Sequence, residues 1–412
     1  MLSVMKLALG NFVFLGFDMK FNAGATLPAK HRPEVGVTYL SLPSRLWALR
    51  FVLLLFASPP LWAQILIGQT TGLTGISAAA VKENNIGAAL WIDAVNARGG
   101  INGEKIDLIS LDDASDQKLA MANARTLIEQ RKVVALFLTR GTPTNEAIIA
   151  VLDQYGVPLV APSTGAMVLH KPVKKHVFNV RTPYQTEAEK AILQLASMGI
   201  SRIGVLQTDD SFGRDAMQGA ERGFASSGLK PSVVAVFPRI SPDFARIAAE
   251  VEAKKLQAVM VLGSGSAVQA AMLAIRQVGS KAQVLSLSNT ASDGFIKGLG
   301  ENARGVMVTQ VFPSERGLAV PMVKEASDLL RATKPTAALS PAMVEGFAGA
   351  KVLVEALRRA GPKPNRVSVQ RALEEMSHFD LGGLVISYSR TNHSGLDRSD
   401  LSIIGGDGRF LR

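Results

Sequence analysis

The chain has 412 residues, 47% of them hydrophobic, which predicts about two domains with apolar cores. It contains no cysteine, and this excludes disulfides, thiolate metal sites, cysteine catalysis and a lipid anchor on an N-terminal cysteine. The formal net charge is +11, but Lys and Arg are scattered among acids without interleaved aromatic residues, so we expect no nucleic-acid partner.

Residues 1–63 have the features of a leader that contains a secretory signal at about 43–63. Arg45 and Arg50 come before an unbroken apolar run, Phe51–Ala57, which a Ser-Pro-Pro sequence ends. This order of positive, apolar and helix-breaking segments is typical of a secretory signal, and the run is too short to span a bilayer. We therefore expect export to the periplasm, with the true translation start shortly before the signal. The alternative is a buried hydrophobic helix.

From Ile65 onward the apolar residues alternate between strand-like and helix-like spacing. Asn84 or Asn85 is a candidate cap for the first helix, and Asp113, Ser115 or Asp116 for the second. The expected elements are, in chain order, a strand from 65, a helix over 84–98, a strand over 105–111, a helix over 117–131, a strand over 133–138, a helix over 144–156 and a strand over 157–163.

The same rhythm then restarts and continues to the end of the chain. Strands are expected over 202–208, 232–238, 258–263, 283–288, 305–312, 382–388 and 401–406, and helices over 214–228, 242–255, 266–279, 292–299, 318–333, 340–360 and 367–376. Strands that alternate with helices of this length predict parallel sheets built from βαβ units. The sequence therefore predicts an α/β protein with two doubly wound parallel-sheet lobes.

In such folds a ligand binds outside the carboxyl ends of the strands, here in a crevice between the two lobes. Chemistry should therefore be sought in the loops that follow strands. These loops are 69–77, 112–116, 139–145, 161–166, 208–213, 263–266 and 287–293.

These loops contain no convincing catalytic, cofactor or metal motif. The segments GLTGIS and GSGSA are rich in glycine but match neither a dinucleotide nor a P-loop pattern. The histidines after residue 63 are widely spaced, and no serine lies in a GxSxG sequence. The pairs Asp112-Asp113 and Asp209-Asp210 point to opposite faces of a strand and fit capping or turn roles better than a metal site. We expect no enzyme activity, no cofactor and no metal.

Hydroxyl groups recur instead at the starts of two predicted helices. Thr142 and Thr144 lie in one such loop, and Ser163 and Thr164 in the next. A helix N-terminus carries free N–H donors and a partial positive charge, so two such loops together could hold a carboxylate. The alternative is that these side chains only cap their own helices.

Several motifs in order resemble periplasmic substrate-binding proteins of branched-chain amino acid ABC transporters, the leucine/isoleucine/valine-binding type. The similarity runs from Gln64 through the rest of the chain. The segments that carry it are GAALWIDAVNARGGINGEKIDLISLDDASD, GVPLVAPSTG, DDSFGRDAMQGAERGFASSG, DFARIAAEVEAKKLQAVMV and FDLGGLVISYSRTNHSG.

The resemblance implies a type I periplasmic binding fold with three crossovers between the lobes, near Arg181–Pro183, Val311–Phe312 and Phe379. It also implies lobe 1 over 64–181 plus 312–378 and lobe 2 over 182–311 plus 379–412. The ligand-binding positions that it suggests, together with those from the loops, are Thr142, Thr144, Ser163, Thr164, Gly165, Ser77, Phe212, Ser264, Asn289 and Arg140.

Two departures from the family pattern bear on the ligand. Where the amino-acid binders have an acid that pairs with the ligand ammonium, this chain has Ser288 and Asn289, with Asp293 a few residues later. A buried ammonium without an anion costs several kcal/mol, so either Asp293 enters the cleft or the ligand has no amine. Arg140 is unusual in a neutral cradle and either pairs with a carboxylate or lies on the surface. The sequence leaves the ligand class open among amino acids, aromatic or aliphatic carboxylates, amides and urea-like solutes.

The resemblance further implies a monomer that closes on its ligand by a hinge and delivers it unaltered to the membrane permease of an ABC transporter. Two other classes of function use similar folds. One is a ligand sensor that responds to an amide or an amino acid. The other is a nucleotide-dependent enzyme, which the missing phosphate loop disfavours.

Overall fold

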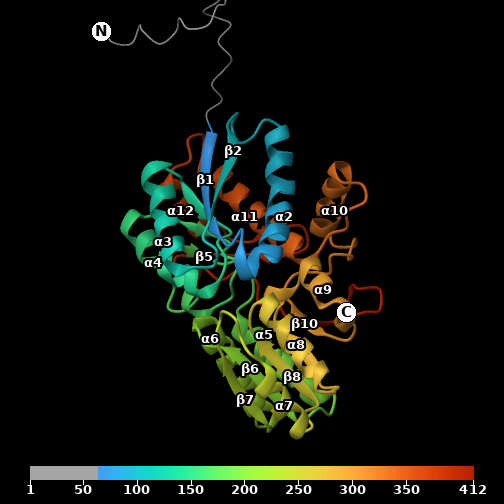
Figure 1. The fold of residues 1–412 in the computed structure, drawn as a ribbon. Coiled ribbons are helices and arrows are strands. Elements are labelled where there is room, and N and C mark those ends of the chain that lie inside the picture. The colour runs from blue at the N-terminus through green and yellow to red at the C-terminus, as the bar shows by residue number, and fades with distance from the viewer. Residues whose placement is uncertain (1–63) are drawn as a thin grey trace, which may run out of the picture. The chain divides into compact units, whose positions relative to one another are not determined.

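The computed structural model describes residues 64–412, and the predicted leader and signal segment lie outside these residues. Two separate sheets organise the described chain (Figure 1). We call the first sheet with its helices lobe 1 and the second sheet with its helices lobe 2. No helix in this part of the chain combines the length and apolar character needed to cross a membrane.

Lobe 1 is built on a five-stranded sheet with the order β2-β1-β3-β4-β5, in which all pairings are parallel. Helices α2, α10, α11 and α12 share a core with one face, and α3 and α4 share a core with the other. The bounds are β1 (Gln64–Thr71), β2 (Lys105–Asp112), β3 (Ala135–Phe137), β4 (Leu159–Val160), β5 (Val177–Phe178), α2 (Ala78–Ala97), α3 (Gln117–Arg125), α4 (Thr142–Tyr155), α10 (Pro321–Thr333), α11 (Pro341–Arg359) and α12 (Arg366–Glu374).

Lobe 2 is built on a seven-stranded sheet with the order β14-β13-β10-β9-β8-β6-β7. Its first five strands in the chain pair in parallel, whereas β13 and β14 add antiparallel at one edge. Helices α5 and α6 cover one face and α7, α8 and α9 the other. The bounds are β6 (Ile203–Thr208), β7 (Val233–Phe237), β8 (Ala258–Leu262), β9 (Gln283–Ser286), β10 (Met307–Gln310), β13 (Asp400–Ile404), β14 (Phe410–Leu411), α5 (Tyr184–Ser197), α6 (Ser211–Ser227), α7 (Ala245–Ala253), α8 (Gly265–Gln277) and α9 (Asp293–Leu299).

This architecture confirms the predicted fold class, with helices on both faces of two largely parallel sheets. The chain passes from the first sheet to the second after β5, leaves the second after β10 and returns to it with β13. The first and third passages touch, since Arg398 N–H donates to Thr182 Oγ1 at 3.0 Å and the Thr182 hydroxyl donates to Arg398 O at 2.6 Å.

The third passage differs from the position expected near Phe379. Residues 379–388 form the small antiparallel pair β11 (Phe379–Asp380) and β12 (Val385–Ile386) and a following loop. Leu381, Ile386 and Tyr388 are buried in the lobe 1 core, and Tyr388 Oη donates to Asn179 O at 2.8 Å. The apolar alternation of this segment is therefore satisfied by lobe 1, and the chain crosses to lobe 2 later, around Arg398.

Helix α2 begins at Ala78, six residues before the expected start, so the prediction that Asn84 or Asn85 caps it is wrong. Asn84 lies inside the helix, where its side chain donates to Ala342 O at 3.1 Å in α11. The acids at the other predicted helix starts do cap and turn the chain. Asp116 accepts from the N–H groups of Lys118 and Leu119 at the start of α3.

Helices α2 and α11 approach so closely that glycine is required where they cross. A Cβ atom on Gly346 would lie 1.9 Å from Asn84 O, and one on Gly87 would lie 1.9 Å from Met343 O. Gly346→Ala should therefore lower the free energy of unfolding by about 1–3 kcal/mol through overpacking, measured by urea denaturation. Arg358→Ala on the exposed side of α11 is the matched control and should change it by less than about 0.5 kcal/mol. Equal stability of the two variants would contradict the crossing.

Candidate ligand-binding site

A cavity of about 260 Å³ lies among the loops at the carboxyl ends of strands from both sheets. Lobe 1 contributes the segment after β1, the Arg140–Thr142 segment after β3 and Ser163 after β4. Lobe 2 contributes Phe212 after β6, the 263–266 segment after β8 and residues from 289 to 298 after β9. The volume is just below the roughly 300–1,000 Å³ typical of sites for drug-sized ligands, so it suits a small solute.

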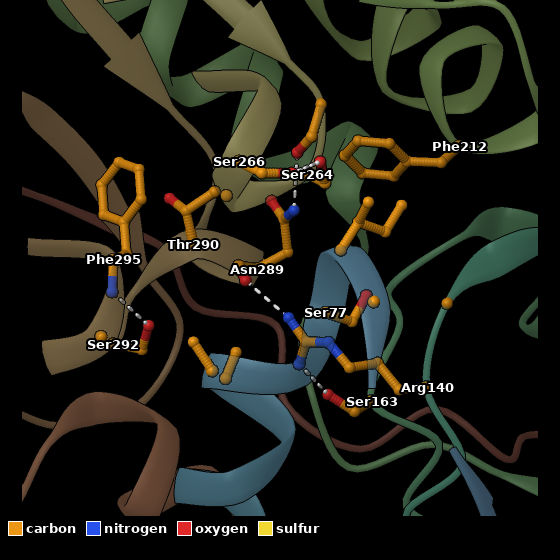
Figure 2. A pocket seen from close by; sticks show the side chains of 18 of the residues that line it. Ser77, Arg140, Ser163, Phe212, Ser264, Ser266, Asn289, Thr290, Ser292 and Phe295 are labelled. Carbon is orange, nitrogen blue, oxygen red and sulfur yellow. Dashed lines mark hydrogen bonds between the residues drawn. The ribbon is translucent and has the colours of Figure 1, made fainter. Parts of the chain in front are cut away.

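Figure 2 shows how side chains from the two lobes face one another across this cavity. Most of the predicted ligand-binding residues line it. These are Ser77, Arg140, Thr142, Ser163, Phe212, Ser264 and Asn289.

Thr144, Thr164 and Gly165 are not among the lining residues and have structural contacts instead. The Thr144 hydroxyl donates to Gly141 O at 3.0 Å and to Arg140 O at 2.5 Å, which secures the start of α4. Thr164 is fully buried, and its hydroxyl shares a 2.8 Å hydrogen bond with the hydroxyl of Thr142. A Cβ atom on Gly165 would lie 2.5 Å from Thr182 O, so glycine lets two loops meet there.

Arg140 joins the two lobes across the cavity. Its Nη1 donates to Asn84 Oδ1 at 3.1 Å and to Ser163 Oγ at 2.9 Å, both in lobe 1. Its Nη2 donates to Asn289 O in lobe 2 at 2.6 Å (Figure 2). Burial lowers the pKa of the Arg140 guanidinium, and the negative charge of Glu345 opposes this shift. The side chain is therefore a desolvated cation at the cavity wall rather than a surface group.

Ser163 connects Arg140 to a buried cluster of charges beneath the cavity. The Ser163 hydroxyl donates to Glu345 Oε1 at 2.8 Å, so its single hydrogen is engaged within the protein. Arg181 forms ion pairs of 3.2 Å with Glu345 and with Glu187. Burial would lower the pKa of Arg181, but Tyr184, Glu345 and Glu187 together raise it above its usual range.

The cavity has a positive electrostatic character from backbone as well as side chains. Helices α2, α4 and α8 all begin at its wall, and each N-terminus carries free N–H donors and a partial positive charge. Ser264 caps α8 by accepting from Ala267 N–H at 3.3 Å. Arg239 adds a second guanidinium, which is paired with Asp210, the cap of α6.

None of the described residues that line the cavity is Asp or Glu. Asp293 lines a different cavity, on the other side of α9 from the site. Glu83 of lobe 1 is engaged elsewhere, because its carboxylate accepts from Asp293 N–H at 3.0 Å and from Gly294 N–H at 2.8 Å. Glu83 thus caps helix α9 of lobe 2 and forms a second contact between the lobes. Residues 64–412 also contain no cluster of three or more His, Cys, Asp or Glu side chains that could hold a metal ion.

Asp293 should make stability depend on pH. Burial, and secondarily the charge of Glu83, raises the pKa of Asp293 from 3.8 to about 6. The folded chain therefore binds more protons than the unfolded chain between these pH values, and its stability falls as pH rises through this window. Asp293→Asn should have little effect near pH 4. Above pH 6 it should raise Tm, through a gain in the free energy of unfolding of less than about 1 kcal/mol because the site is partly exposed to solvent.

The pH series should be measured by thermal unfolding of both proteins from pH 4 to 7. Asp113 and Asp215, whose pKa values are also raised to about 6 by burial, are unchanged in the variant, so their contribution cancels in the difference. A difference between the proteins that does not grow with pH would contradict the assignment to Asp293.

Several residues that line the cavity are not among the predicted binding positions. Thr290 and Ser292 lie inside the predicted loop 287–293, whereas Tyr184, Arg239 and Phe295 lie outside the predicted loops. A signal for Tyr184 exists in the sequence, because Tyr184, Ala188, Ile192 and Leu195 have the spacing of a buried helix face, and they belong to α5. Arg239 lies in a loop beyond a strand of the outer edge and gave no such signal.

The chain is similar to known proteins in sequence and structure. A family model described as "Periplasmic binding protein" matches residues 64–401. The "Leu/Ile/Val-binding protein homolog 3" of Brucella melitensis biotype 1 is 25% identical over 340 residues, 80% of this chain and 88% of that protein. A substrate-binding periplasmic protein from Ralstonia solanacearum has a TM-score of 0.79 at 32% identity, over 84% of this chain and 99% of that one. A leucine binding protein from Thermotoga maritima shares the fold, with a TM-score of 0.76 at 18% identity, over 84% of this chain and 98% of that one.

These matches run through both lobes and through every loop that lines the cavity. The similar proteins are described as binding proteins. This chain therefore belongs to the periplasmic binding protein family, with a substrate-binding role in the periplasm.

Proposed function

We propose that this protein is the solute-binding component of an ABC importer that takes up an amino acid or a related small carboxylate. The observation that carries the proposal is the position of Arg140, a partly buried guanidinium at the wall of a cavity lined by both lobes. The similarity to proteins named for leucine, isoleucine and valine supports a small organic ligand. The protein would act as a monomer and release its ligand unaltered to a membrane permease.

Binding would proceed by hinge closure between the lobes. The ligand would first contact lobe 1, through Arg140 and the start of α4, and lobe 2 would then close over it. Contacts that exist only in the closed form determine how far the equilibrium shifts. Two such contacts are those of Arg140 with Asn289 O and of Glu83 with the start of α9.

The proposal is tested by a thermal-shift screen of amino acids, organic acids and amides, followed by small-angle scattering with and without each stabilising compound. We expect one chemical class to raise Tm and to reduce the radius of gyration. Deletion of the gene in its host should then lower uptake of the same radiolabelled compound. Absence of any stabilising compound, or turnover of a bound one, would contradict a solute-binding role in transport.

The location follows from the same proposal and can be checked separately. If residues 43–63 act as a secretory signal, protein recovered from the periplasm should lack them. Intact mass measurement of that material should give an N-terminus close to Gln64. Recovery of a chain that still begins at Met1 would contradict the assignment of the signal.

A further inference from the structure

We infer that the ligand is a monocarboxylate that carries no ammonium group, with an aliphatic or aromatic body. This inference rests on the proposed function and narrows its ligand class. It excludes α-amino acids as the preferred ligands, although the similar proteins named above include amino-acid binders.

The charges around the cavity carry the first step of the argument. The charged side chains among the described lining residues are Arg140 and Arg239. Arg239 is neutralised by its ion pair with Asp210, whereas Arg140 has no carboxylate within ion-pair distance in the described chain. A partly buried guanidinium at the cavity wall without a carboxylate partner calls for one ligand carboxylate, since ligand binding would bury its unpaired charge further, which is costly.

The second step is the number of donors that Arg140 still offers. A guanidinium has five N–H groups in a planar fork. Three are used, by Asn84, Ser163 and Asn289 O. The Nε–H and one Nη2–H make no hydrogen bond within the described residues. Nε and Nη2 are neighbouring nitrogens of the guanidinium, a pair to which a carboxylate can bind in the bidentate geometry that arginine favours.

The third step concerns where an ammonium could be placed. It would need an anion beside it, but the cavity lining offers no carboxylate among the described residues. The side-chain oxygen of Asn289 accepts no hydrogen bond there, but a neutral amide does not balance the charge of an ammonium. Two backbone carbonyls on the lobe 2 side already accept hydrogen bonds from the protein itself. Asn289 O accepts from Arg140, and Gly263 O accepts from the Asn289 side chain at 2.9 Å. The starts of α2, α4 and α8 would repel a cation in addition.

The rest of the lining indicates the body of the ligand. Phe212 and Phe295 lie on opposite sides of the cavity in Figure 2, with Ser264 and Thr290 between them. Ile76, Ala79 and Ala80 add apolar surface from lobe 1. Such a wall buries hydrocarbon, and its hydroxyl groups tolerate small polar substituents. A branched aliphatic or a phenyl group therefore suits it.

The test uses pairs of compounds that differ by the amine alone. These are 4-methylpentanoate against leucine and 3-phenylpropanoate against phenylalanine, titrated calorimetrically into the purified full chain. We expect the amine-free acid of at least one pair to bind at least about 10-fold more tightly than its amino acid. Equal or tighter binding of the amino acids would overturn this inference and leave the solute-binding proposal standing. No binding by any compound in the transport screen would overturn both.

A charge placed in the cavity gives a second readout. Ser264→Asp keeps a good cap for α8, since Asp and Ser are equally favoured there, and it adds the anion that the site lacks. The matched control is Ser264→Asn, which caps equally well without charge. We expect Ser264→Asp to weaken binding of the amine-free acid by about 10-fold relative to Ser264→Asn. The preference for the amine-free acid over its amino acid should become smaller or reverse. If the ratio of the two dissociation constants within a pair did not change, selection against the ammonium by charge would be contradicted.

Discussion

Arg181→Met is expected to lower the free energy of unfolding by about 3–5 kcal/mol, because it strands two buried carboxylates. Arg181 is 1% exposed and bridges Glu187 and Glu345 through 3.2 Å ion pairs. It also donates to the Ser288 hydroxyl and lies over the ring of Tyr184, 4.8 Å from its centre. Glu187 in turn accepts from Ser288 N–H at 3.0 Å. The methionine would fill much of the space but leave both acids without their counter-ion.

The loss can be assigned to charge rather than to packing by combining substitutions. Adding Glu187→Gln and Glu345→Gln to Arg181→Met removes the stranded charges, and the triple variant should recover part of the stability. A buried carboxylate without its counter-ion is destabilising only while it is charged, so the stability deficit of the single variant should shrink as pH falls. Urea denaturation at pH 5 and pH 8 measures both effects. A deficit that is independent of pH and additive across the substitutions would contradict a charge origin.

The fold was largely predictable because local signals and tertiary structure agree in this chain. Alternating strands and helices required two doubly wound sheets, and buried strands such as β8 appear in the sequence as continuous apolar runs. The predicted capping role of an acid before a helix is also confirmed for Asp116 and Asp210. The predicted start of α2 was wrong because asparagine is a common helix cap. Asn84 instead lies inside the helix, where it contacts α11 and Arg140.

The site was predictable at the level of loops and less so at the level of side chains. The rule that ligands bind at carboxyl ends of strands selected the segments that line the cavity. The sequence could not decide between Asp293 and Arg140, because their directions depend on how the lobes meet. Glu83, which is far from α9 in the chain, accepts hydrogen bonds from the first N–H groups of α9. The side chain of Asp293 lines another cavity. Such pairings over long sequence distances leave no local pattern.

Arg140→Gln should weaken binding of the preferred acid by about 100-fold, which corresponds to about 3 kcal/mol for a lost charged hydrogen bond. The substitution removes the positive charge and the two free donors, Nε–H and one Nη2–H. Glutamine can still reach a neighbour such as Ser163. Calorimetric titration with the tighter-binding acid of the two pairs measures the effect. Arg239→Gln is the matched control: it lines the same cavity, but its charge is already neutralised by Asp210, so it should weaken binding less than about 10-fold.

The same variant should separate binding from stability, in contrast to Arg181→Met. Arg140 has no direct ion pair in the described chain, so its removal strands no carboxylate. Its burial also disfavours its charge. Glu345 would keep its ion pair with Arg181 and its hydrogen bond from Ser163. We therefore expect Arg140→Gln to unfold within about 1 kcal/mol of the unsubstituted protein while it loses the ligand. Loss of stability as large as that of Arg181→Met, with binding retained by the folded fraction, would make Arg140 a structural bridge between the lobes rather than the ligand anchor.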